Sequence, residues 1–133
     1  MKKNILVVDD NAINQKVLIR MVQTLGYDAL GAFDGEEAIS KLNEEKISLV
    51  LMDCNMPVMD GYVTTQRIRE MESSGMPEIN ITASNPIPII ALTADAMSGV
   101  HEKCIAAGMN DYLTKPVDLI LLGKTISSHL KKE

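Results

Sequence analysis

Aromatic residues are scarce in this sequence. The 133 residues include one Phe, three Tyr and no Trp, which together make up 3% of the chain. Flavin pockets built between rings and surfaces that stack single-stranded nucleic acid both depend on aromatic side chains. Basic residues are also outnumbered, because 13 Lys and Arg stand against 18 Asp and Glu and the net charge is −5. We therefore expect no nucleic-acid binding by this chain, since its charge has the wrong sign to neutralise a phosphate backbone.

Cysteines and long apolar runs are limited as well. Cys54 and Cys104 form no CxxC pair and have no histidine at ligand spacing, so the sequence predicts neither a disulfide framework nor a zinc site. No apolar run approaches the roughly 20 residues of a membrane-spanning helix, and the amino terminus has no signal-peptide core. We expect a cytoplasmic protein whose domain makes no membrane contact.

Apolar residues are abundant, and they occur in short blocks. The hydrophobic fraction of 46% suits one domain over residues 1–133, with a core that needs no metal or disulfide to hold it. Blocks typical of buried strands occur at 5–8, 27–31, 49–52, 87–92 and 112–113. Helical apolar spacing occurs between them, at 13–25, 38–42, 62–73, 97–107 and after 118. This alternation predicts five βα units, that is, an open parallel sheet with helices on both faces.

Two segments between these blocks carry further expectations. The first helix should bury one apolar face and end at Gly26; that face would consist of Ile13, Val17, Leu18, Met21, Val22 and Leu25. Residues 73–86 are rich in Ser, Asn, Pro and Gly, which predicts a surface loop.

Polar residues stand at the carboxyl ends of the predicted strands. Asp9 and Asp10 follow the first strand, Asp53 the third, Thr93 the fourth and Lys115 the fifth. In an open parallel sheet these ends share the ligand-binding edge. Two carboxylates 4 Å apart repel by about 4 kcal/mol at an effective dielectric of 20, so the group predicts a bound divalent cation, most simply Mg²⁺. One aspartate could then attack phosphorus, while the threonine hydroxyl and lysine ammonium hold the transferred oxygens.

These residues also support a family resemblance. Together with Met56-Pro57, Asp60-Gly61, Thr93-Ala94 and Lys115-Pro116, they resemble the receiver domain of two-component response regulators. The resemblance covers essentially the whole chain, and segments 10–15, 52–61 and 88–94 are most similar to receivers of hybrid histidine kinases. It implies a doubly wound, flavodoxin-like α/β fold with five parallel strands in the order 2-1-3-4-5.

The resemblance implies a role for each site residue. Asp53 would accept a phosphoryl group from a phosphohistidine. Mg²⁺ would be held by Asp9, Asp10, Asp53 and the main-chain carbonyl of Asn55. The acyl phosphate would be bound by Thr93 and Lys115, and the Lys115-Pro116 peptide bond would be cis.

A switch and a docking surface are implied in the same way. Thr93 would move towards the phosphate and Tyr112 would turn inward, which would change the face formed by the fourth helix, fifth strand and fifth helix. The partners would be a histidine kinase, a histidine phosphotransfer protein, or both. Ile13 and Val17, on the first helix, would help to form the docking surface for the phosphotransfer protein.

Other functions compete with this interpretation. A metal-dependent phosphatase with an aspartyl nucleophile generally needs a second Asp two residues later, where this chain has Asn55. A nucleotide or flavin module needs a Gly-rich loop after the first strand, and residues 9–12 contain no Gly and two charges. A degenerate docking scaffold is disfavoured, because all five expected site positions are filled. We expect a regulatory phosphoacceptor that catalyses only its own phosphorylation and slow dephosphorylation.

Overall fold

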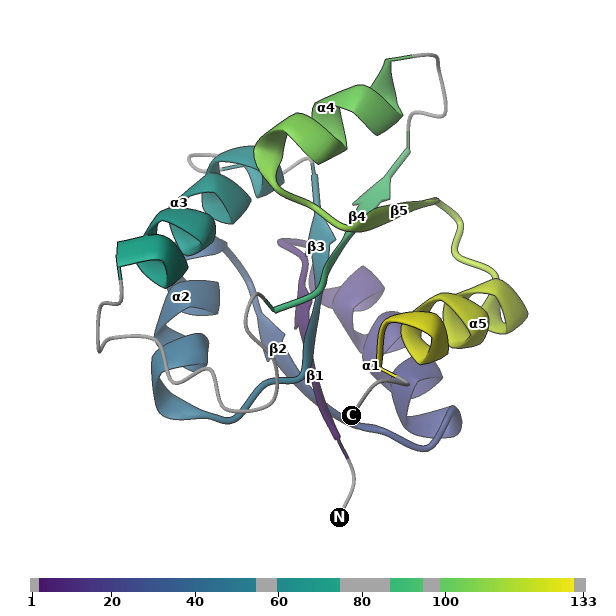
Figure 1. The fold of residues 1–133 in the computed structure, drawn as a ribbon. Coiled ribbons are helices and arrows are strands. Elements are labelled where there is room, and N and C mark those ends of the chain that lie inside the picture. Colours follow the sequence, from purple (N-terminus) through teal and green to yellow (C-terminus); the bar gives the residue numbers. More distant parts are fainter. Residues whose placement is uncertain (1–2, 55–59, 75–86, 95–98, 131–133) are drawn as a thin grey trace.

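Strands and helices alternate along the chain, as the apolar blocks predict (Figure 1). The computed structural model describes residues 3–54, 60–74, 87–94 and 99–130. The strands are β1 (Asn4–Val8), β2 (Asp28–Ala32), β3 (Leu49–Asp53), β4 (Ile89–Thr93) and β5 (Asp111–Thr114). The helices are α1 (Ala12–Thr24), α2 (Gly35–Glu44), α3 (Gly61–Ser74), α4 (Val100–Ala107) and α5 (Leu119–Leu130). Within the described ranges, no helix has the length and apolar character needed to cross a membrane.

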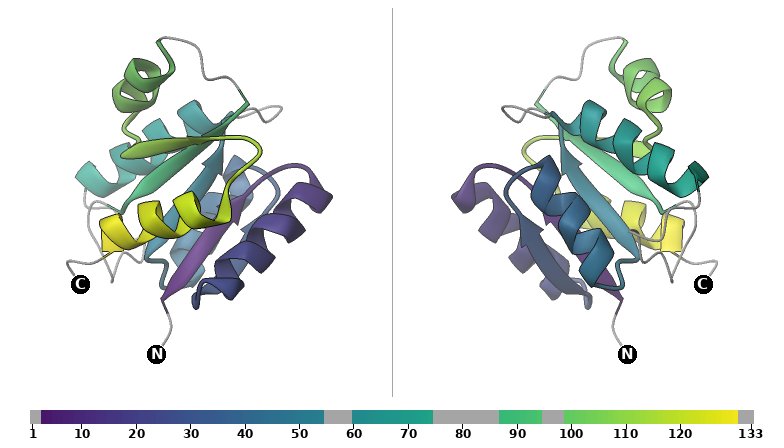
Figure 2. Two further views of the ribbon diagram at one scale, coloured as in Figure 1. Left: turned by 90° about the vertical axis from the view of Figure 1, so that its right-hand side faces the viewer. Right: turned by 90° about the vertical axis from the view of Figure 1, so that its left-hand side faces the viewer.

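The five strands form one parallel sheet in the order β2-β1-β3-β4-β5, which confirms the order that the resemblance implies. Helices α1 and α5 cover one face of this sheet, and α2, α3 and α4 cover the other (Figure 2). Every residue of β3 and β4 is buried, because both neighbours and both helical layers enclose these strands. Such continuous apolar runs are typical of parallel sheets covered on both faces.

The core has two layers, because successive side chains of a strand point to opposite faces of the sheet. The layer under α1 and α5 contains Ile5, Val7, Leu18, Val22, Leu49, Leu51, Ile90, Leu92, Leu113, Leu122, Ile126 and Leu130. The layer under α2, α3 and α4 includes Leu6, Val8, Ala38, Leu42, Val50, Met52, Ile68, Ile89, Ala91 and Cys104. The two layers hold all five strand ends in fixed register, which positions the polar residues that follow them.

The buried face of α1 differs from the predicted one. The apolar spacing placed Ile13 and Val17 on the buried face, whereas the resemblance placed them on a docking surface; they are 73% and 54% exposed, which contradicts the first expectation and is compatible with the second. The buried positions of α1 are Gln15, Leu18 and Val22, spaced three and four residues apart. The helical period places residues three and four apart on one face, so the face that contains Gln15 points away from Ile13 and Val17.

Several element boundaries also move by one to three residues. Strand β4 begins at Ile89, because Pro88 has no N–H to donate, although the Pro88 carbonyl still accepts from the Val50 N–H at 2.9 Å. Helix α4 begins after Gly99, whose φ of 97° is left-handed, whereas a start at Met97 was expected; Met97 lies outside the described residues. Most of the loop predicted over 73–86 lies outside them too.

Candidate functional site

The carboxyl edge of the sheet gathers the polar residues that the sequence singled out. Asp53 and Thr93 are the last residues of β3 and β4, each 2% exposed, and Asp9 lies directly after β1 with no exposed surface. The strand pairing continues one step into the loops, since the Asp9 N–H donates to the Ala32 carbonyl at 3.0 Å. Likewise, the Lys115 N–H donates to the Thr93 carbonyl at 2.8 Å. The backbone of the sheet therefore aims these side chains at one place.

Three carboxylates meet there. One oxygen each of Asp9, Asp10 and Asp53 lies within 4.8 Å of the others; Asp9 and Asp53 are buried, and Asp10 is exposed. The Lys115 ammonium lies 3.0 Å from Asp53 Oδ1 and 3.7 Å from Asp9 Oδ2. With all four groups ionised, their charges sum to −2. Lys115 therefore offsets only part of the negative charge of the three carboxylates, and the net negative charge suits a cation.

Asp9 shows where such a cation would find a ligand. Its Oδ1 accepts the Asn11 N–H at 2.9 Å, whereas its buried Oδ2 has no hydrogen-bond partner among the described residues. Burial raises the pKa of Asp9 above its ordinary value, and the charges of Asp53 and Asp10 add to this, against the Asn11 N–H and Lys115. A buried carboxylate oxygen without a hydrogen bond is costly unless a cation coordinates it.

The donor set fits Mg²⁺. The three side chains supply hard oxygen ligands, and Mg²⁺ typically takes one or two carboxylates, several waters and phosphate oxygens. The main-chain carbonyl of Asn55, expected as a further ligand, lies outside the described residues. An acidic cluster able to hold a cation is therefore present at the predicted position.

Gly61 allows α3 to begin against the end of β3. Its N–H donates to the Cys54 carbonyl at 3.3 Å, and a Cβ at this position would overlap the Asp53 carbonyl oxygen. Asp60 caps the same helix end, since its Oδ1 accepts the Val63 N–H at 2.9 Å. The Asp60-Gly61 pair therefore fixes the start of α3 against Cys54, the residue that follows Asp53.

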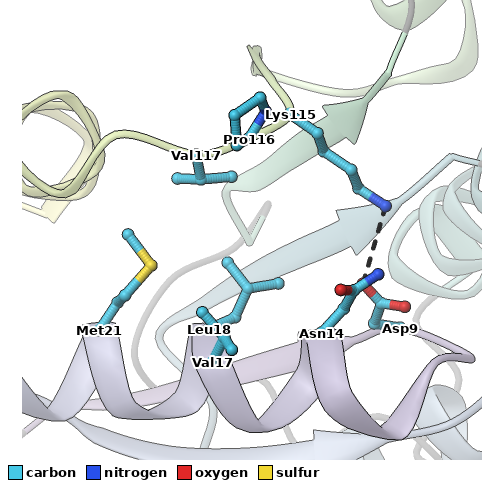
Figure 3. Close-up of a pocket in the computed structure, with 8 residues that line it drawn as sticks. All are labelled: Asp9, Asn14, Val17, Leu18, Met21, Lys115, Pro116 and Val117. Atoms are coloured by element: carbon cyan, nitrogen blue, oxygen red, sulfur yellow. Dashed lines mark ion pairs between the residues drawn. The ribbon is translucent and has the colours of Figure 1, made fainter.

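A groove of about 420 Å³ leads away from the carboxylates, between α1 and the segment after β5 (Figure 3). It is lined by Asp9, Asn14, Val17, Leu18, Met21, Lys115, Pro116 and Val117. In Figure 3 the Lys115 side chain reaches across towards Asp9. The Lys115-Pro116 peptide bond is cis, as expected. The groove joins the site to the exposed side of α1.

Tyr112 lies at the predicted place on β5, opposite Ala91 in the sheet. It is partly buried and packs against the core layer under α2, α3 and α4. This position is next to the strand that ends in Thr93. Its role as a switch residue stays a prediction.

The structure brings the two cysteines together, which the sequence did not predict. Cys54 and Cys104 are both free and buried, and Tyr62 lies within side-chain hydrogen-bonding reach of both thiols. Burial raises the pKa of the Cys54 thiol to about 11 and also raises that of Cys104. Both cysteines serve as small core residues.

Gln15 is a site residue that the apolar pattern did not identify. It is 6% exposed and donates to the main chain beside Asp9. Its sequence signal is a long polar side chain at a position where α1 faces the sheet. Gly31, which lies inside β2, contributes the second signal, because a glycine in a strand often marks a close approach by another group.

Fold and site define the class: an open parallel α/β protein with an acidic, lysine-paired site at the carboxyl edge of its sheet. Comparison with known families then identifies the chain, since the model for the response regulator receiver domain matches residues 5–127. The chain belongs to this family.

Individual relatives agree with the assignment. The chain is 39% identical, over 99% of its length, to the hybrid signal transduction protein dokA of Dictyostelium discoideum, but covers only 7% of that protein. A similar solved structure is the receiver domain of sensor histidine kinase PA1611 from Pseudomonas aeruginosa, which has a magnesium ion in its active-site cleft. It matches with a TM-score of 0.81 and 37% identity, and the match covers 98% of this chain and 99% of that one. The Ssk1 receiver domain of Saccharomyces cerevisiae, co-crystallised with the phosphotransfer protein Ypd1, matches with a TM-score of 0.85, 34% identity and coverage of 98% and 90%.

Proposed function

We propose that this chain is a phosphoacceptor of a phosphorelay, in which Asp53 takes a phosphoryl group from a phosphohistidine. The observation that carries the proposal is the meeting of Asp9, Asp10 and Asp53 with Lys115 at the carboxyl edge of the sheet. The buried Oδ2 of Asp9, which has no hydrogen-bond partner among the described residues and lies 3.7 Å from the Lys115 ammonium, supports a cation as part of the working site. The magnesium ion in the similar receiver of PA1611 supports the same assignment.

The transfer balances with the groups present. A carboxylate oxygen of Asp53 attacks phosphorus, and the P–N bond breaks with its electron pair left on the departing ring nitrogen. The proton on the other ring nitrogen makes the departing imidazole neutral. Asp9, Asp10, Asp53 and the Asn55 carbonyl would hold Mg²⁺, which would supply positive charge to the phosphoryl oxygens. Lys115 already pairs with Asp53, and in the product its ammonium is placed to bind an oxygen of the acyl phosphate. Thr93 offers a hydroxyl to the same group.

We further propose that the donor or acceptor partner is a histidine phosphotransfer protein or a histidine kinase, docking over the exposed face of α1. Ile13 and Val17 present apolar surface to solvent there, and Val17 also lines the groove that leads to Asp9 and Lys115. A phosphohistidine side chain could reach the carboxylates from this direction. The Ypd1 complex of the similar Ssk1 receiver supports this partner class.

The remaining expectations belong to the same proposal. Residues 1–133 form one receiver domain, Tyr112 reports phosphorylation to the face formed by α4, β5 and α5, and the chain does not turn over phosphate esters. The cytoplasmic location stays a prediction. Because the chain spans only a small part of the curated relatives it matches, the activity and partners of a larger protein are part of what is proposed.

The test is transfer from a purified, phosphorylated histidine phosphotransfer domain in Mg²⁺ buffer. We expect the label to move to this chain in the presence of Mg²⁺. We expect no transfer when EDTA removes the Mg²⁺, and no label on Asp53→Asn. The surface variant Glu70→Gln, on the exposed side of α3, is the matched control and should accept the label normally. Multiple turnover of p-nitrophenyl phosphate by the wild type would instead favour the aspartyl phosphatase.

A further inference from the structure

The Gln15 side chain connects three elements beneath the site. It projects from α1, and its Nε2 donates to the Ala32 carbonyl at the end of β2 at 2.8 Å and to the Asp9 carbonyl after β1 at 3.3 Å. Both partners are carbonyl oxygens, so only the NH₂ end of the amide can satisfy them. Since the side chain is buried, both bonds lie away from competing water.

These bonds complete the restraint of Asp9. Its N–H donates to the same Ala32 carbonyl at 3.0 Å, its carbonyl accepts from Gln15, and its Oδ1 accepts the Asn11 N–H. The main chain on both sides of the Asp9 Cα is therefore held, and one carboxylate oxygen is held as well. The other carboxylate oxygen, Oδ2, has no hydrogen bond among the described residues and lies 3.7 Å from the Lys115 ammonium at the carboxylate cluster.

Gly31 makes the space in which the Gln15 amide lies. A Cβ at Gly31 would overlap Gln15 Oε1 and would lie 2.6 Å from its Cδ. Glycine weakens a strand interior, so its presence in β2 is costly unless something fills the space. In this molecule, the amide of Gln15 fills it.

We propose that Gln15, seated on Gly31, is a positioning residue of the phosphoryl-transfer site: it orients the Asp9 main chain so that Oδ2 lies at the carboxylate cluster, where Mg²⁺ would bind. The inference rests on the proposed function, because it concerns the Mg²⁺ that this function needs. Gln15 acts through Asp9 and touches neither the phosphoryl group nor the metal. Residues that orient a metal ligand commonly change metal affinity by about 10- to 100-fold when they are replaced.

The test replaces Gln15 with Met, which keeps the length and shape of the side chain but removes both donors. Mg²⁺ affinity is measured directly by amide chemical shifts during titration with MgCl₂. We expect binding about tenfold weaker than in the wild type. The control is Gln23→Met, at an exposed position of the same helix, which should bind Mg²⁺ as the wild type does.

A second readout separates positioning from general loss of structure. In labelling with acetyl phosphate, the Mg²⁺ concentration for half-maximal rate should rise about tenfold in Gln15→Met, whereas the rate at saturating Mg²⁺ should stay within about threefold of the wild type. Partial unfolding would lower the saturating rate and leave the Mg²⁺ requirement unchanged.

The variant Gly31→Ala tests the same idea without altering Gln15, and it decides the matter alone if Gln15→Met fails to fold. Its methyl group meets the end of a flexible side chain, so the fold should tolerate it while the amide is displaced. We expect weaker Mg²⁺ binding in this variant too. Wild-type Mg²⁺ affinity in the folded variants overturns the inference, whereas a wild type that binds no Mg²⁺ overturns the proposed function.

Discussion

Replacing Asp9 with Asn should stabilise the metal-free protein, although it removes a group of the site. Asn keeps the Oδ1 acceptor for the Asn11 N–H and discards the charge. At an effective dielectric of 20, Asp53 repels Asp9 by about 3.5 kcal/mol or more, since one oxygen of each carboxylate lies within 4.8 Å of the other. Asp9 is attracted to Lys115 by about 4 kcal/mol at 3.7 Å. These two contributions nearly cancel, so the cost of burying the Asp9 charge decides the sign.

The pKa of Asp9 is raised, which also indicates that the charged form is disfavoured in the folded protein, because the effect of burial on this pKa exceeds the opposing effect of Lys115. We therefore expect Asp9→Asn to be more stable than the wild type in EDTA by about 1–2 kcal/mol, or about 3–8 °C in Tm. Saturating Mg²⁺ should reverse the order, since Mg²⁺ at 100 times its Kd stabilises the wild type by about 2.7 kcal/mol and the variant much less.

Urea unfolding followed by far-UV circular dichroism measures both effects and suits a chain without Trp. Glu70→Gln removes one exposed negative charge from α3 and serves as the control, with a change below about 0.5 kcal/mol. A metal-free Asp9→Asn protein that is less stable than the wild type would refute the reasoning, because the Lys115 ion pair would then outweigh burial.

Two further predictions concern the packing next to Asp53. Burial raises the pKa of Cys54 from 9.0 to about 11, so its stabilising contribution is complete below pH 9 and is lost as the pH rises through 11, by about 3 kcal/mol in total. In urea titrations, Cys54→Ala should lose less stability than the wild type over this range, and equal losses would contradict the assignment. Gly61→Ala should cost about 2 kcal/mol, because the methyl overlaps the Asp53 carbonyl; Gly123→Ala, whose methyl meets only the flexible Leu25 side chain, should cost less in the same assay. Equal costs would mean that α3 can shift away from β3.

The sequence predicted the main features of the fold because they depend on local patterns. Short β-branched runs that alternate with helical spacing define βα units, and the carboxyl ends of such strands share one edge. Asp9, Asp53 and Thr93 could therefore be assigned to one site before any contact was known. The strand order depends on which strands pair, which local patterns do not determine; only the family resemblance implies it.

Contacts between distant segments could not be predicted in this way. The apolar spacing of α1 suggested that Ile13 and Val17 are buried, whereas the helix turns Gln15 to the sheet, where β2 supplies a carbonyl and a glycine pocket. The approach of Cys54 to Cys104 depends in the same way on how α4 packs over β3. Two sequence signals point to the contact between Gln15 and β2: a polar residue at a buried helix position and a glycine inside a strand.

The assignment of Asp53 as the phosphoacceptor can be tested by mass spectrometry of the labelled protein. The protein is incubated with acetyl phosphate and Mg²⁺, and one part is analysed at once by intact-mass spectrometry. A second part is reduced with borohydride, which releases the phosphoryl group and leaves homoserine at the phosphorylated residue, and is then analysed by peptide mass spectrometry. The account predicts one added phosphoryl group per chain, located by conversion of residue 53 to homoserine, and no addition in Asp53→Asn. Undiminished labelling of that variant, or a phosphoryl group located on another residue, would contradict it.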